Sequence, residues 1–136
     1  MRALIAVVWA LAFSLAAQAQ DASPLSEYLW LKRPLVVFAD TPNDPRYIRQ
    51  MELLEKNPVD REELEERDVV ILSDSDPVAN TALRQALHPR GFMLVIYDKD
   101  GSILFRKPVP WSVREISRAI DKTPMRQDEI SEKLGK

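Results

Sequence analysis

The sequence predicts an α/β domain built on a four-stranded mixed sheet that is flanked by helices. Two apolar runs, 35–39 and 69–72, are each followed by a helix-start pattern, as expected for parallel strands buried on both faces. A third apolar run, 92–97, leads into the turn sequence DKDG at 98–101, which is typical of a β-hairpin. The hairpin makes the last two strands antiparallel, so the predicted sheet is mixed.

A short helical extension is predicted ahead of the first strand. Ser23 and Pro24 form a favoured helix start, and apolar residues of 25–31 recur on one face. We expect Trp30 to lie in the core. Pro34 ends the segment, because the residue before a proline avoids the helical conformation.

Pairs of aspartate and proline mark the helix starts after the first two strands. Asp44 precedes Pro45 and opens a helix that we expect to end at Pro58. The charged stretch 60–67 is interpreted as a solvated connector of one or two helical turns. Asp76 precedes Pro77 and opens a second helix, which the His-Pro-Arg-Gly sequence at 88–91 closes.

The C-terminal third continues the pattern. Residues 102–107 alternate polar and apolar side chains, as expected for an edge strand. Ser112 and Glu115 have the spacing of a capping box at the start of the next helix. Thr123 and Pro124 start a last, short helix, which forms the C-terminal extension.

The first 19 residues have the layout of a secretory signal peptide. One basic residue, Arg2, precedes the apolar run 3–17, and Ala17-Gln18-Ala19 is a typical cleavage site. The apolar run is short for a membrane span, which needs about 20 residues. We therefore expect residues 20–136 to form one exported domain, periplasmic or extracellular, that has no membrane contact after cleavage.

Composition excludes several function classes. The chain contains no cysteine, which rules out thiol–disulfide exchange, thiol-dependent peroxide reduction and thiolate metal sites. Removing residues 1–19 leaves 18 basic and 21 acidic residues, a net charge of −3. A mildly acidic chain with no basic stripe argues against nucleic-acid binding.

The order of elements resembles the thioredoxin fold, which implies the strand order 2-1-3-4. In that fold a redox loop follows the first strand, and residues 40–44 occupy its place. The fold also places a cis-proline just before the third strand, where this chain has Met93, and Pro89 lies too early. The two parts of the thioredoxin redox site are its cysteine pair and this cis-proline, and the chain has other residues at both places.

The chain also resembles a family of short exported bacterial proteins known only as a domain of unknown function. The likeness lies in the opening motif within 25–39, the segments 66–68 and 99–101, and the closing motif IDxxPMRxxE at 120–129. It implies a thioredoxin-like fold and export, and it supplies no activity.

The closing motif has two interpretations. Arg126 can serve as a receptor for an anion, because its guanidinium binds carboxylates bidentately. Alternatively the motif is a structural clasp in which Pro124 fixes a bend, Met125 fills the core, and Arg126 pairs with Asp121 or Glu129. We favour the clasp, because each residue type has a local structural use.

The loop after the first strand is the candidate ligand-binding site, since α/β sheets bind ligands at the carboxyl ends of their strands. Against this, Asp44 is placed to cap the helix N–H groups that would hold an anion, so a well-capped turn is the simpler interpretation. The residues that we assign to the candidate site are Asp40, Thr41, Asn43, Arg46 and Arg90.

Four aspartates follow the first two strands: Asp40, Asp44, Asp74 and Asp76. Their oxygens suit a hard cation such as Ca²⁺, but no spacing matches a calcium loop, and Asp44 and Asp76 are better explained as helix caps. We predict no metal site and no cofactor.

Two functions remain open. The first is a non-redox binding module for a protein, peptide or small anion, with an envelope protein or peptide as partner. The alternative is a metal-assisted hydrolase that uses the carboxylates at the strand ends. The missing redox groups favour the first, and an enzymatic role is less expected.

Overall fold

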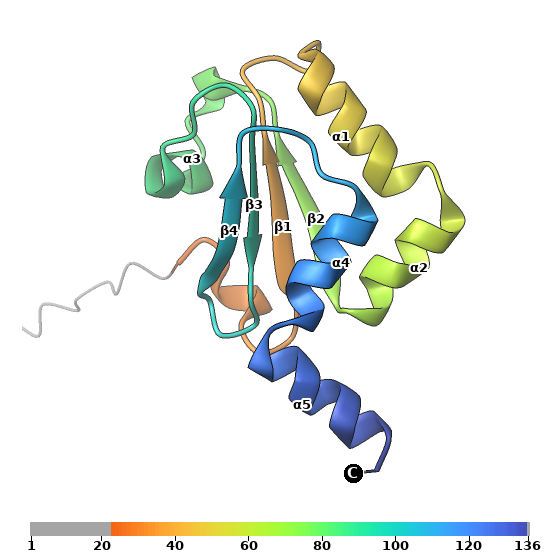
Figure 1. Ribbon diagram of the computed structural model, residues 1–136. Helices are drawn as coiled ribbons and strands as arrows, with labels where there is room; N and C mark the ends of the chain where they lie inside the picture. Colours follow the sequence, from red (N-terminus) through yellow and green to blue (C-terminus); the bar gives the residue numbers. More distant parts are fainter. Residues whose placement is uncertain (1–22, 136) are drawn as a thin grey trace, which may run out of the picture.

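The computed structural model describes residues 23–135 (Figure 1). The predicted signal peptide therefore lies outside the described residues. The strands are β1 (Arg33–Phe38), β2 (Val69–Asp74), β3 (Met93–Tyr97) and β4 (Ile103–Lys107). The helices are η1 (Ser26–Tyr28), α1 (Pro45–Glu55), α2 (Pro58–Glu66), η2 (Pro77–Ala79), α3 (Ala82–Leu87), α4 (Val113–Asp121) and α5 (Pro124–Lys133).

The four strands form one mixed sheet in the order β2-β1-β3-β4, as predicted. β1 runs parallel to β2 and antiparallel to β3, and β3 and β4 form the hairpin. All six residues of β1 are buried, because the strand has neighbours on both sides and helices over both faces. Met93 pairs with Phe38, so the start of β3 lies beside the end of β1.

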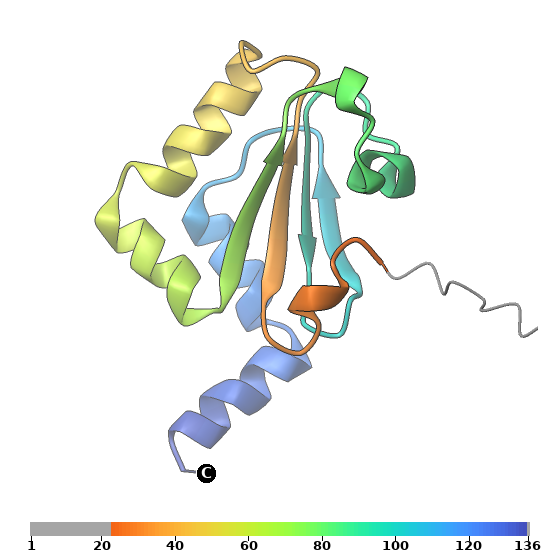
Figure 2. The same cartoon turned by 180° about the vertical axis from the view of Figure 1, so that it is seen from behind.

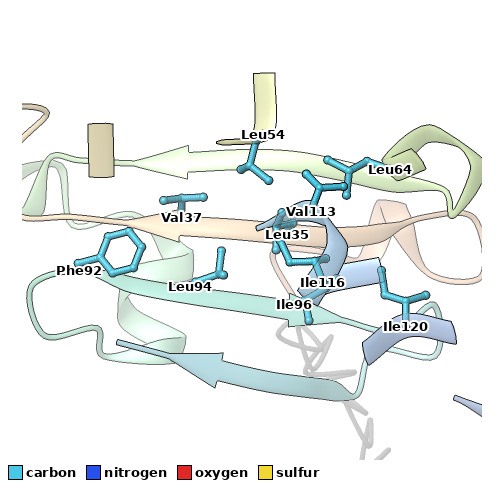
Figure 3. Packing of buried hydrophobic residues seen from close by; sticks show 10 residues of the cluster. All are labelled: Leu35, Val37, Leu54, Leu64, Phe92, Leu94, Ile96, Val113, Ile116 and Ile120. Atoms are coloured by element: carbon cyan, nitrogen blue, oxygen red, sulfur yellow. The ribbon is translucent and has the colours of Figure 1, made fainter. Parts of the chain in front are cut away.

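The main core lies between the sheet and the helices α1, α2 and α4 (Figure 1). Figure 3 shows side chains from the sheet, among them Leu35, Val37 and Ile96, meeting Leu54 of α1 and Ile116 of α4. The opposite face carries η1 and α3 (Figure 2), with a smaller cluster around Val36, Phe38, Leu87 and Val95. Helices on both faces of the sheet give a three-layered arrangement, as expected for this element order.

Two helical segments differ from the prediction. Residues 58–66 form a full helix rather than a connector, because Pro58 is its first residue and the Asn57 side chain caps it by accepting from the N–H of Val59 at 3.0 Å. The helix after β2 is broken: Asp76 caps only the short η2, Asn80 takes a left-handed conformation, and α3 starts afresh. Local caps decided both boundaries.

The prediction that Trp30 lies in the core is wrong. Its side chain is 68% exposed, and its backbone has a φ of +64°. The N–H of Trp30 donates to the carbonyl of Lys99 at 2.7 Å, which fixes this turn against the hairpin. Within residues 23–135, no helix combines the length and apolar character needed to cross a membrane.

Candidate functional site

The loop end of the sheet, where β1 and β2 finish and β3 begins, carries the predicted site. The Asp44 carboxylate accepts from the backbone N–H of Arg46 at 2.9 Å and pairs with the guanidinium of Arg46 at 3.0 Å. These contacts hold the pKa of Asp44 below its ordinary value, the hydrogen bond from the Arg46 side chain contributing most. The start of α1 is thus capped and its nearest cation neutralised, so this loop is a poor receptor for an anion.

Arg46 nevertheless joins this loop to the segment before β3. Its guanidinium lies over the Phe92 ring, 5.7 Å from the centroid, and a Cβ added at Gly91 would come within 3.4 Å of Nη2 of Arg46. Arg90 lies beside that contact and is exposed. Asp40, Thr41 and Asn43 are also exposed, and the only side-chain hydrogen bond shown for the three among the described residues is from the Asn43 N–H to Thr41 Oγ1.

A buried ion pair between Arg84 and Asp74 holds the ends of the strands at this end of the sheet. Arg84 donates to the Asp74 carboxylate at 3.0 Å and to the carbonyl of Ala39 at 2.6 Å, and its guanidinium lies 5.6 Å from the centroid of the Phe38 ring. Burial would raise the pKa of Asp74, but hydrogen bonds from Thr81, the backbone of Asp76 and Arg84 outweigh it and lower the pKa. Arg84 therefore ties the ends of β1 and β2 together.

Replacing Arg84 with methionine tests that tie. The change removes the cation that pairs with the Asp74 carboxylate and the side-chain donor to the Ala39 carbonyl, so we expect the free energy of unfolding to fall by about 2 kcal/mol. We also expect faster amide exchange in residues 39–44 than in β3. Urea unfolding and hydrogen exchange measure the two effects, and a uniform rise in exchange across the sheet would contradict the local role.

Three of the four aspartates are engaged by other groups. Asp44 is held by Arg46, Asp74 by Arg84 and Thr81, and Asp76 accepts from the N–H of Val78. In the part of the chain that the structure describes, no three acidic or histidine side chains are grouped to hold a metal ion. No observation favours the metal-assisted hydrolase.

A groove of about 300 Å³ lies on the other side of Arg90, between the segment before β3 and the end of β4. We call it the cationic groove; its lining residues are His88, Arg90, Phe92, Met93, Arg106, Lys107 and Pro108. The lining contains three permanent cations and no carboxylate. Arg90 is the one residue of the predicted site that lines it.

Neutral groups hold two of these cations in place. Arg106 donates to the carbonyl of Leu87 at 3.2 Å, and Nζ of Lys107 lies 4.7 Å from the centroid of the Trp111 ring. The sequence alone did not point to either residue, since they lie 16 and 17 positions after Arg90 and form no basic run. The one usable signal was that a hairpin returns the end of β4 to the start of β3.

The opposite end of the sheet holds a network of ion pairs that we call the clasp. Its centre is Arg33, which is fully buried at the start of β1. Arg33 binds Asp98 at 3.0 Å and Glu129 of α5 bidentately, at 2.9 and 3.1 Å. Lys99 joins Glu129 at 2.8 Å to Asp68 at 2.7 Å. The clasp thus ties α5 to the sheet and the hairpin.

The closing motif lies within this network. Arg126 is 2% exposed and lies 3.3 Å from Glu129 and 3.5 Å from Asp121, both the pairings considered for it. Pro124 is the first residue of α5. Met125 differs from its expectation, because it is only half-buried and lies outside both core clusters. In this structure the motif makes internal contacts, and its arginine is not open to a ligand.

The clasp also sets the charge state of its carboxylates. Burial would raise the pKa of Glu129, but hydrogen bonds from Arg33 and Lys99 lower it from 4.5 to about 2. Arg67 binds Asp121 bidentately, both contacts at 2.9 Å, and its hydrogen bonds lower the pKa of that carboxyl. Each carboxyl therefore stays ionised through the ordinary pH range.

Comparison with known protein families shows which family the chain belongs to. The model of the family described as "Domain of unknown function (DUF4174)" matches residues 24–129, a range that includes all strands, the cationic groove and the clasp. The chain belongs to the DUF4174 family. No curated protein matches it.

A solved structure supports the fold assignment of this DUF4174 protein. The chain is similar to a crystal structure of reduced 2-Cys peroxiredoxin from Plasmodium vivax, with a TM-score of 0.59 and 15% sequence identity. The match covers 77% of this chain and 83% of that chain. Together with the strand order, it confirms the thioredoxin-like fold; identity at this level carries no function across.

Proposed function

We propose that this DUF4174 protein is an exported, non-redox thioredoxin-like module that works by binding a partner at the loop end of the sheet. The observation that carries the proposal is the cationic groove. It lies beside the position of the redox loop, and its three cations have no acidic partner among the described residues. A groove with polar residues in its lining at the carboxyl ends of the strands is where α/β proteins bind ligands.

The contrast between the two ends of the sheet supports this assignment. In the clasp, Arg33, Arg67, Lys99 and Arg126 each pair with at least one carboxylate. In the cationic groove, Arg106 donates to a carbonyl and Lys107 lies over an aromatic ring, and neither pairs with a carboxylate among residues 23–135. A chain with more acidic than basic residues thus leaves positive charge uncompensated in one groove. Such a field attracts anionic partners and speeds their association.

Differential capture tests the proposal. The protein from residue 20 onward is immobilised as wild type, as the double variant Arg90→Gln and Arg106→Gln, and as the control double variant Arg61→Gln and Arg114→Gln. The control removes the same charge from exposed arginines outside the groove. Each sample is exposed to envelope extract of the source cell, and the bound proteins are quantified by mass spectrometry.

We expect a set of envelope components that wild type and control retain and the groove variant loses by at least tenfold, with circular dichroism confirming that all three are folded. Equal capture by all three samples would remove the cationic groove as the binding surface.

A further inference from the structure

We infer that the cationic groove takes a carboxylate attached to an apolar body, such as the C-terminal residue of a peptide or a small organic acid. This inference rests on the proposed function and specifies its ligand. It follows from the shape of the groove, its floor and its charges, which each restrict the chemistry further.

The size of the groove limits the ligand to a small group. Its volume of about 300 Å³ lies at the lower end of the range for small-molecule pockets. At about 30 Å³ for each water molecule in the liquid, it holds roughly ten waters. One amino-acid residue with its terminal carboxylate, or an organic acid of similar size, fits this space, whereas a folded domain contacts only its rim.

The floor of the groove is apolar. Phe92 closes the bottom of the groove but is only 1% exposed, so the apolar surface open to a ligand comes from Met93, which is half-buried, and Pro108, which is exposed. None of these side chains offers a hydrogen-bond donor or a charge. A bare inorganic anion would leave this surface in water. A ligand with an apolar body covers it and gains the hydrophobic contribution of the buried area.

The walls provide donors for one anionic group. Arg106 uses one guanidinium nitrogen on the Leu87 carbonyl, so its remaining N–H groups are available, and Arg90 forms no ion pair among residues 23–135. Arginine binds a planar carboxylate bidentately, which gives geometric selectivity as well as attraction. Lys107 also lines the groove, but its Nζ lies over the Trp111 ring, which is not part of the lining.

A larger groove elsewhere on the molecule lacks this pattern. It has a volume of about 500 Å³ and runs along β2. Its charged lining is mixed, with Glu55 and Glu65 beside Arg61, so it has no preference for an anion. Arg61 therefore supplies a matched control for the cationic groove, since it is also exposed and forms no ion pair within the described residues.

Matched probes test the inference by isothermal titration calorimetry. The tripeptide acetyl-Gly-Leu-Phe is used with a free C-terminal carboxylate and as its carboxamide, which has nearly the same shape but no charge and an NH2 donor in place of one acceptor oxygen. Phenylbutyrate represents a free organic acid, and inorganic phosphate represents a bare anion. We expect the peptide acid to bind at least tenfold more tightly than the amide, and phosphate to bind more weakly than either acid.

Two single variants test whether the probes bind in the cationic groove. We expect Arg90→Gln to weaken binding of the peptide acid about tenfold and to leave the amide unchanged, while Arg61→Gln alters neither. Tighter binding of the peptide acid than of phenylbutyrate assigns the ligand to peptide C-termini, and the reverse assigns it to organic acids.

Equal affinity for acid and amide, phosphate binding as tight as that of both organic acids, or no binding of any probe would overturn the inference. The proposed function would still stand if envelope capture depended on the groove, and it would fail only if capture did not.

Discussion

Replacing Arg33 with methionine is expected to lower the free energy of unfolding by about 3–5 kcal/mol. Arg33 has no exposed surface, and its guanidinium binds Asp98, Glu129 and the carbonyl of Arg67. Methionine fills a similar volume but leaves the buried Asp98 carboxylate without a cation among the described residues and removes the bidentate partner of Glu129, which keeps Lys99 and Arg126. Urea unfolding at pH 7 measures the loss.

Two further variants separate pairing from packing. Arg61→Met removes an exposed arginine outside the clasp, and we expect a change within about 0.5 kcal/mol. The double variant Arg33→Met with Glu129→Gln removes both partners of the bidentate pair, so it should be more stable than the sum of the two single losses predicts. Strict additivity, or a loss below about 1 kcal/mol for Arg33→Met, would show that the clasp contributes little.

Stability is expected to fall in acid because of Glu129. Its pKa is about 2 in the folded protein and 4.5 ordinarily, so the folded state holds its proton less tightly than the unfolded state. The resulting stabilisation is complete above pH 4.5 and is lost as the pH falls toward 2. A depression of this size corresponds to roughly 3 kcal/mol. Urea unfolding from pH 7 to pH 2 should show a plateau and then a decline.

The variant Glu129→Gln tests whether Glu129 causes the loss of stability in acid. It cannot titrate, so it should be less stable than wild type at pH 7 and should lose less stability between pH 4.5 and 2. Asp121 and Asp74 also have lowered pKa values, so part of the decline will remain. Glu62→Gln, at an exposed position with no ion pair among the described residues, should follow the wild-type curve. Parallel curves for wild type and Glu129→Gln would contradict the assignment.

Local signals predicted most of the elements correctly. The apolar runs at 35–39, 69–72 and 92–97 became β1, β2 and β3, and the capping box of Ser112 and Glu115 starts α4 as expected. Caps were less decisive where two competed. The Asn57 side chain caps the start of α2 instead of only marking the end of α1. After the left-handed Asn80 ends η2, the Thr81 side chain caps the start of α3.

The candidate site was only partly predictable. The sequence indicated the end of β1 as the place for a ligand and Arg90 as a member of the site. It could not show that Asp44 neutralises Arg46, or that Arg106 and Lys107 line a groove with Arg90. Pairing across strands depends on register, and register is set by the whole sheet and its core rather than by neighbouring residues.

By itself the sequence determined the alternation of strands and helices, the absence of thiol chemistry and the mixed sheet, because periodicity, composition and turn residues act over a few positions. Only the tertiary structure decided which charges are satisfied. Arg33 and Arg90 are both arginines in a short chain, yet one is buried among carboxylates and the other is exposed beside an apolar floor. Their different roles follow from partners that lie far away along the chain, and only folding brings such partners into contact.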